Sequence, residues 1–187
     1  MIEKLLSAIA KELDKHQIPY MVIGGQAVLI YGFPRLTEDI DITLGVDVDK
    51  IGLIKDVCRR IGLRIPRQID EDFINETSVL VAVDKRSRIR VDFIFSFTEY
   101  EKNALKRTKK IKMNNQSVRY ASIEDVIIHK LFAGRPRDIE DVEIIMQKNK
   151  GKIDVVYLKR NLQQFASFEN KKDIVKDYED ILERINR

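Results

Sequence analysis

The chain of 187 residues has no tryptophan, four prolines and a single cysteine, Cys58. One cysteine excludes a framework of internal disulfides, and its place in the apolar stripe of Ile54 and Ile61 marks it as a small core residue. No apolar run reaches the length of a membrane span, and no signal-peptide core follows the first methionine. We therefore expect a protein of the cytoplasm that does not engage a membrane.

The composition is that of a folded domain. Hydrophobic residues make up 44% of the chain and charged residues 34%, which argues against disorder. The length fits one domain, or one domain with a small appendage. The net charge of +4 favours an anionic partner without identifying one.

Hydrophobic periodicity predicts alternating strands and helices in the first two thirds of the chain. Helices are expected over residues 2–15, 26–31, about 47–61 and 99–107, and strands over 20–23, about 39–44, 78–84, 88–97, 110–113 and 117–120. Residues 63–74, which contain Pro66, predict only a short strand and a surface loop. The pattern indicates an α/β (α+β) fold with a mixed sheet flanked by helices.

The pattern becomes wholly helical after residue 121. Ser122 and Asp125 form a capping box, Gly134 is placed to end the first helix, and Pro136 is placed to begin the second. Two further amphipathic helices follow. We expect two domains: residues 1–121 as the α/β domain and residues 122–187 as a C-terminal helical bundle packed against it.

Two carboxylates occur on one predicted strand. Asp39 and Asp41 are two residues apart, so they project from the same face and form a candidate clamp for Mg²⁺ ions. A third acid, Asp92, lies within an apolar strand where an unpaired carboxylate is costly. Simpler readings stay open: Asp39 as a loop acid, and Asp92 paired with Arg90 or Arg35.

A glycine pair, Gly24-Gly25, separates the predicted strand at residues 20–23 from a short helix. Glycines there allow close backbone approach, and the helix N-terminus offers free amides to a triphosphate. Paired glycines are also common in tight turns, so this feature gains weight mainly from its distance to the two aspartates.

These motifs together resemble the DNA polymerase β superfamily of nucleotidyltransferases, whose signature is a glycine pair, an acid-x-acid strand and a third acid on a later strand. A narrower similarity is to the abortive-infection toxin group of these enzymes. It rests on Arg35-x-Thr37-x-Asp39-x-Asp41 and on the later motif Lys130-Leu131-x-Ala133-x-Arg135-x-Arg137-Asp138-x-x-Asp141. The resemblance extends from Tyr20 to about Ile145.

The resemblance implies roles for the residues of the motif. Asp39 and Asp41 would hold two Mg²⁺ ions, for which Mn²⁺ could substitute, and Asp92 would complete the catalytic site and help activate a hydroxyl. Gly24 and Gly25 would line the triphosphate pocket. Many superfamily members have serine after the first glycine, so a hydroxyl contact to phosphate is missing here.

Three further residues are implied to bind nucleotide: Arg35, Lys130 and Asp138. Arg35 could instead anchor the aspartate strand, and Lys130 could be a lysine whose stem is buried and whose head reaches solvent. Asp138 and Asp141 could equally be acids stabilised by a helix N-terminus, or Asp138 could pair with Arg135.

The implied activity is transfer of a nucleoside monophosphate from an NTP to a hydroxyl, with release of pyrophosphate. The acceptor is left open among an RNA end, a protein and a small molecule, and the toxin similarity adds an antitoxin as a partner. The alternatives are a non-catalytic nucleotide-binding or regulatory module and an RNA-binding protein. The latter would use a basic cluster that is more simply a solvated surface: Lys102, Lys106, Arg107, Lys109, Lys110 and Lys112.

Overall fold

The computed structural model describes residues 1–34, 36, 37, 39–96 and 98–186. Its internal contacts divide the chain into two compact units. The first consists of Met1–Gln26 and Leu36–Ala121, and the second of Ala27–Arg35 and Ser122–Arg187. The first unit contains the β-sheet, and the second is helical.

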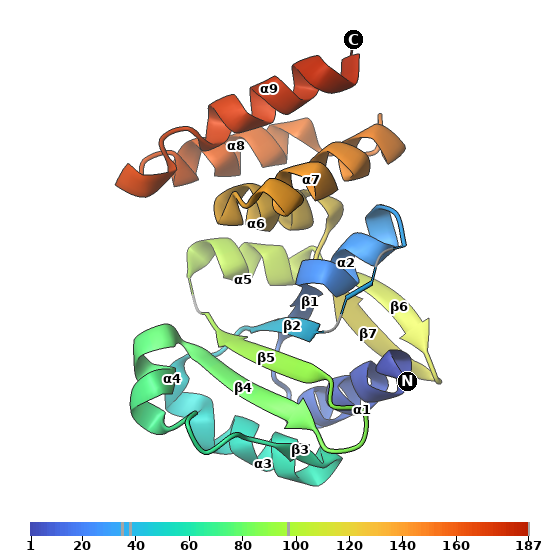
Figure 1. Ribbon diagram of the computed structural model, residues 1–187, viewed down its shortest axis with the longest axis vertical. Coiled ribbons are helices and arrows are strands. Elements are labelled where there is room, and N and C mark those ends of the chain that lie inside the picture. Colours follow the sequence, from blue (N-terminus) through green and yellow to red (C-terminus); the bar gives the residue numbers. More distant parts are fainter. Residues whose placement is uncertain (35, 38, 97, 187) are drawn as a thin grey trace. The chain divides into compact units, whose positions relative to one another are not determined.

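The first unit is built on a mixed sheet with the strand order β3-β4-β5-β2-β1-β7-β6 in the described part of the chain (Figure 1). Its strands are β1 (Tyr20–Ile23), β2 (Asp39–Leu44), β3 (Leu63–Arg64), β4 (Val79–Asp84), β5 (Arg90–Phe95), β6 (Lys109–Met113) and β7 (Gln116–Tyr120). The pairs β2–β5 and β1–β7 are parallel and the others antiparallel. The α+β fold class with a mixed sheet is therefore confirmed.

Several helices of this unit pack against the sheet. The unit contains α1 (Ile2–Lys15), the 3-10 helix η1 (Val48–Lys50), α3 (Ile51–Ile61), α4 (Glu71–Thr77) and α5 (Glu99–Lys106). Helix α1 contacts α3, β6 and β7. Alternate residues of β2 are fully buried, among them Ile40 and Ile42, so the strand has one core face and one face that can carry charge.

Two local predictions for this unit need correction. Helix α4 was missed, because seven residues are too few to show a helical period; its signal is Asp70, whose side chain accepts a hydrogen bond of 2.9 Å from the amide of Phe73. Helix α2 (Gly24–Tyr31) begins at Gly24 and not at Gln26, so the glycine pair is the first turn of the helix itself.

The second unit contains α6 (Ile123–Ala133), α7 (Pro136–Lys148), α8 (Val155–Phe165), the 3-10 helix η2 (Glu169–Lys171) and α9 (Ile174–Asn186). The predicted capping box is confirmed: Ser122 Oγ accepts from the Asp125 amide at 3.2 Å and donates to Asp125 Oδ2 at 2.6 Å. Gly134 ends α6 with φ +67°, and Pro136 begins α7. Among the described residues, no helix has both the length and the apolar character needed to span a bilayer.

Residues 27–35 belong to this helical unit, although they lie between two sheet strands in sequence. Two side chains from the end of α7 and beyond it hold this segment. Lys148 Nζ donates to the carbonyl of Gly32 at 2.7 Å, and Asn149 Nδ2 donates to the carbonyl of Tyr31 at 2.8 Å. Side chains that bond the backbone in this way satisfy carbonyls at the C-terminal end of α2.

A closed network of charges joins α6 to α7. Lys130 Nζ lies 2.5 Å from Asp138 Oδ1 and 3.0 Å from Asp141 Oδ2, and Arg135 Nε lies 2.6 Å from Asp138 Oδ2. The side chains of Lys130 and Asp138 are only 8% and 3% exposed. Burial alone would raise the pKa of Asp138, but the hydrogen bonds from Arg135 and Lys130 outweigh it and lower that pKa.

We predict that Asp138→Asn lowers the free energy of unfolding by about 2–4 kcal/mol, because it leaves a buried lysine with one carboxylate fewer. Because the pKa of Asp138 is lowered in the folded state, its carboxylate stabilises the protein at pH values above 3.8, the ordinary pKa of aspartate. This stabilisation is lost as the pH falls through the folded-state pKa. The variant should therefore lose less stability on acidification. Urea unfolding at a series of pH values measures both effects.

The matched control for this prediction is Asp180→Asn, on the exposed face of α9, which should change the free energy of unfolding by less than about 0.5 kcal/mol. If the buried network did not stabilise the protein, Asp138→Asn would lower the free energy of unfolding no more than this control does.

Candidate active site

Three carboxylates share one face of the sheet. Asp39 and Asp41 lie in β2, and Asp92 lies in β5. The parallel register of these strands places Asp41 opposite Asp92 and Asp39 opposite Arg90. Since paired residues project to the same side, the three acids and Arg90 lie together, away from the buried face of the sheet. Asp39 is thus a strand residue and not a loop acid.

Gly24 is the position that lets the Asp41 carboxylate lie where it does. Asp41 pairs with Ile23 across the antiparallel β1–β2 ladder, and Gly24 follows directly with φ +61°. A Cβ at residue 24 would come within 1.9 Å of Asp41 Oδ2 and 2.8 Å of its Cγ. Only glycine fits both the backbone conformation and the space, so the first turn of α2 and the Asp41 carboxylate are in direct contact.

Two polar side chains position the start of β2. Thr37 Oγ1 donates to Asp39 Oδ1 at 3.3 Å, and Gln26 Nε2 donates to the Asp39 carbonyl at 3.4 Å. Gln26 is 4% exposed and was not singled out from the sequence. Its signal is a polar residue in the first turn of an otherwise apolar helix, directly after the glycine pair.

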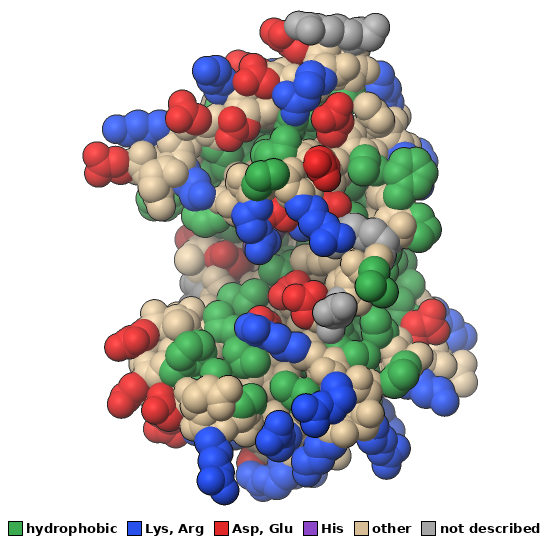
Figure 2. Space-filling view, in the orientation of Figure 1, with side chains coloured by type: hydrophobic (Ala, Val, Ile, Leu, Met, Phe, Trp, Pro, Cys, Tyr) green, Lys and Arg blue, Asp and Glu red, His purple; other side chains and the backbone are tan. Residues whose placement is uncertain are grey.

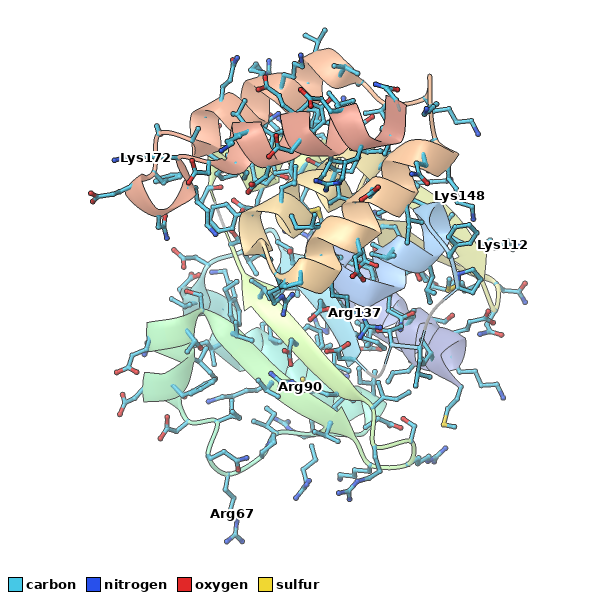
Figure 3. The ribbon with its side chains drawn as sticks, turned by 45° about the horizontal axis from the view of Figure 1, so that its top comes forward. Arg67, Arg90, Lys112, Arg137, Lys148 and Lys172 are labelled. Atoms are coloured by element: carbon cyan, nitrogen blue, oxygen red, sulfur yellow. The ribbon has the colours of Figure 1, made fainter. Side chains whose placement is uncertain are left out.

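Arg90 holds Asp92 through both carboxylate oxygens. Its Nε lies 2.7 Å from Oδ1 and its Nη2 lies 2.8 Å from Oδ2, a bidentate pair (Figure 3 labels Arg90 above the strands). The pKa of Arg90 is raised, chiefly by this hydrogen-bonded pair, with smaller contributions from the charges of Asp39 and Asp41. The alternative that pairs Asp92 with Arg90 is thus realised, and the same guanidinium also attracts Asp39 and Asp41.

The donor chemistry suits Mg²⁺, which prefers carboxylate oxygens. In this arrangement, however, no three His, Cys, Asp or Glu side chains of the described residues are gathered closely enough to hold a metal ion. Both oxygens of Asp92 are bonded to Arg90. Asp39, Asp41 and Asp92 are the residues that would hold a metal, and the Arg90 guanidinium on Asp92 would compete with it electrostatically.

The remaining predicted residues are not part of the described first unit. Arg35 is outside the described residues. Lys130 and Asp138 belong to the helical unit, where they pair with each other. Lys130 is buried to its amino group, so it does not reach solvent as the simpler reading had it, whereas the predicted pairing of Asp138 with Arg135 is confirmed.

The fold resembles solved nucleotidyltransferase structures. The solution structure of the antibiotic-resistance factor ANT(2″)-Ia matches with a TM-score of 0.60 and 15% identity, covering 90% of this chain and 95% of that one. An antigenic nucleotidyltransferase-like protein from Paracoccidioides brasiliensis gives 0.58 and 17%, covering 90% of each chain. The lincosamide antibiotic adenylyltransferase LnuA, with lincomycin bound, gives 0.53 and 16%, covering 76% of this chain and 94% of that one. At these identities the likeness establishes the fold alone.

Sequence comparison gives the family. No curated protein sequence matches the chain significantly. The family model described as "nucleotidyltransferase of unknown function (DUF6036)" matches residues 1–186, which is almost the whole sequence. The protein, with its glycine-backed pair of aspartates and a third acid in register on the next strand, belongs to this nucleotidyltransferase family.

Proposed function

We propose that this protein is a Mg²⁺-dependent nucleotidyltransferase that moves a nucleoside monophosphate from an NTP to a hydroxyl, with its chemistry in residues 1–121. The observation that carries the proposal is the common sheet face of Asp39, Asp41 and Asp92. A nucleotide-binding module would need the contacts to phosphate but not a third carboxylate aligned with the second. Mn²⁺ could substitute for Mg²⁺ at such oxygen donors.

In the proposed reaction, the acceptor oxygen forms a bond to the α-phosphorus while the bond from this phosphorus to the bridging α,β-oxygen breaks. Pyrophosphate leaves, and Asp92 takes the hydroxyl proton. Bound Mg²⁺ would lower the pKa of the hydroxyl and neutralise the charge on the phosphates. Asp39 and Asp41 would hold the metal, and the amides of Gly24 and Gly25 at the start of α2 would face the triphosphate.

Other nucleotide contacts are proposed from the sequence motif. Arg35 is one of them. The motif with Lys130 and Asp138 supports a contact by either residue, for which an ion pair inside the helical unit would have to open.

The acceptor and the biological role are also proposed. One solved neighbour contains adenylyl-2″-tobramycin and another lincomycin, which supports a small hydroxyl-bearing acceptor. The motif shared with abortive-infection enzymes supports a toxin that acts in the cytoplasm on RNA or protein and is restrained by an antitoxin.

We predict that wild-type protein transfers label from at least one α-labelled NTP in the presence of Mg²⁺ and cell extract, and that Asp41→Asn reduces transfer by about 100-fold or more. Asp49→Asn, an exposed acid in η1, is the matched control and should transfer normally. Equal labelling by wild type and Asp41→Asn would refute the assigned catalytic role.

Growth arrest on induction of the wild type, but not of Asp41→Asn, tests the toxin role.

We predict that Gly24→Ala lowers transfer by at least about 100-fold, because the methyl group displaces the Asp41 carboxylate from its position by more than an ångström. Two controls separate the causes. Gly62→Ala has the same backbone strain, with φ +80°, but open space around its Cβ, and Gly52→Ala has neither strain nor contact. Steady-state transfer rates should fall only for Gly24→Ala. A similar fall for Gly62→Ala would show that backbone strain, and not the contact with Asp41, causes the loss of transfer.

We predict that Arg90→Met tightens Mn²⁺ binding in the absence of nucleotide by about 3- to 30-fold, because it frees Asp92 and removes a positive charge from the acids. Mn²⁺ titration followed by electron paramagnetic resonance measures the affinity without requiring activity. Lys85→Met removes an exposed charge in the β4–β5 turn and should leave the affinity unchanged. Unchanged binding by Arg90→Met would show that Asp92 takes no part in holding the metal.

A further inference from the structure

A group of exposed cations lies at the β3 edge of the sheet, in the first unit. We call it the cationic edge; it comprises Arg64, Arg67, Lys85, Arg86 and Arg88. They come from β3, the segment after it and the β4–β5 turn, which β3–β4 pairing brings together. Figure 2 shows Lys and Arg side chains gathered over this part of the molecule, at the lower end of the view, and Figure 3 shows Arg67 pointing away from the sheet.

None of these cations forms a close ion pair among the described residues. Ion pairs within residues 51–96 join Lys55 with Glu71, Arg59 with Asp56 and Arg90 with Asp92, and none of these involves a member of the cationic edge. Asp84, in the same turn, accepts hydrogen bonds from the amide and hydroxyl of Ser87 and also attracts Arg86. Five exposed positive charges with so little local compensation form a field that favours an anionic ligand.

The strand register connects this edge to the carboxylates. Arg64 pairs with Val83, Val83 with Arg90, and Arg90 with Asp39, so these four residues form one row across β3, β4, β5 and β2. Paired residues project to the same side of a sheet. Arg64 is therefore on the same face as the three acids, three strand spacings from Asp39, or about 14 Å.

The distance of about 14 Å between Arg64 and Asp39 favours an extended chain of phosphates over a single triphosphate as the ligand of the cationic edge. A triphosphate held at Gly24 and Asp41 would lie beyond β2, on the side that faces away from the cationic edge. Arg64, a member of the cationic edge, and Arg90 instead lie in the row that ends at Asp39, as an extended chain of phosphates leading toward the acids would require. Among the described residues 59–96, no aromatic side chain is strongly exposed, so the ligand would be held by its backbone and not by stacking of its bases.

We propose that the cationic edge binds the phosphodiester backbone of a single-stranded nucleic acid and directs its terminal hydroxyl toward Asp39, Asp41 and Asp92. Binding requires only the cations. The identity of this strand as the acceptor rests, in addition, on the proposed transferase function. Binding is independent of sequence and depends on salt, because it comes from charge neutralisation of phosphates.

The test uses fluorescence anisotropy with labelled RNA and DNA 12-mers, in EDTA and without NTP, between about 50 and 200 mM salt. The triple variant Arg64→Gln, Arg86→Gln, Arg88→Gln should bind about 10- to 100-fold more weakly, and its slope of log affinity against log salt should be shallower by about 2. Asp41→Asn should bind as the wild type does, so that loss of transfer and loss of binding are separable. RNA and DNA arms show which sugar is preferred.

The matched control removes the same charge from another exposed basic surface: Lys106→Gln, Lys110→Gln and Lys112→Gln, on α5 and β6. It should retain wild-type affinity. A second triple variant, Arg64→Lys, Arg86→Lys and Arg88→Lys, keeps the charges and should bind as the wild type does, which separates loss of charge from poor folding.

Three results would overturn the proposal: no binding of either oligomer by the wild type, equal weakening by the two glutamine triples, or weakening with an unchanged salt slope. If the protein binds no oligomer but transfers label to a small molecule or a protein, nucleic acid is not the ligand of the cationic edge. The transferase function would still stand in that case.

Discussion

The structure of the sheet unit depends on how three carboxylates are kept close together on one face. Two unit charges about 5 Å apart repel by about 3 kcal/mol at an effective dielectric constant of 20, so Asp41 and Asp92 in register oppose folding of the strands that carry them. Arg90 offsets this repulsion with a bidentate pair and with longer-range attraction to Asp39 and Asp41. The buried residues on the other face of β2 and β5 supply the remaining stability of the arrangement.

The two units compensate their charges in different ways. In the helical unit, Lys130 and Asp138 are almost fully buried, and each carboxylate in the network has a cation in contact, so opening it would expose charge in an apolar surrounding. In the sheet unit, Arg90 is 55% exposed and can exchange its partner for another anion at small cost. The helical network thus contains a buried lysine whose charge depends on its two carboxylates, whereas the cation of the sheet site is solvated without its partner.

Much of this site follows from sequence patterns that have a direct physical cause. The alternation of Asp39 and Asp41 with buried isoleucines predicted their common face, and the glycine pair predicted a close backbone approach, which the structure shows at Gly24. The choice between Arg90 and Arg35 as the partner of Asp92 could not be made from sequence. Arg90 and Asp92 share one face of β5, but their bidentate contact depends on side-chain conformations that the sequence does not specify. The position of Asp92 opposite Asp41 depends on the β2–β5 register, which pairs residues 51 positions apart.

Other features were out of reach for the same reason. The partners of Lys130 lie 8 and 11 residues away, on the next helix, so their contact depends on how α6 and α7 pack. The grouping of residues 27–35 with the helical unit depends on Lys148 and Asn149, whose role no local pattern reveals. The cationic edge likewise forms only when β3 pairs with β4, because its members are separated by about 20 residues in sequence.

The bidentate hold of Arg90 on Asp92 also has a thermodynamic meaning. A guanidinium that leaves one carboxylate needs another anion, and the phosphates of a nucleotide are such anions. Metal ion and nucleotide would then each lower the free-energy cost of binding the other, since one takes the carboxylate that the other helps to release. Such reciprocal linkage would leave the resting protein with little affinity for free cations and make the metal–nucleotide complex, rather than either component alone, its natural ligand.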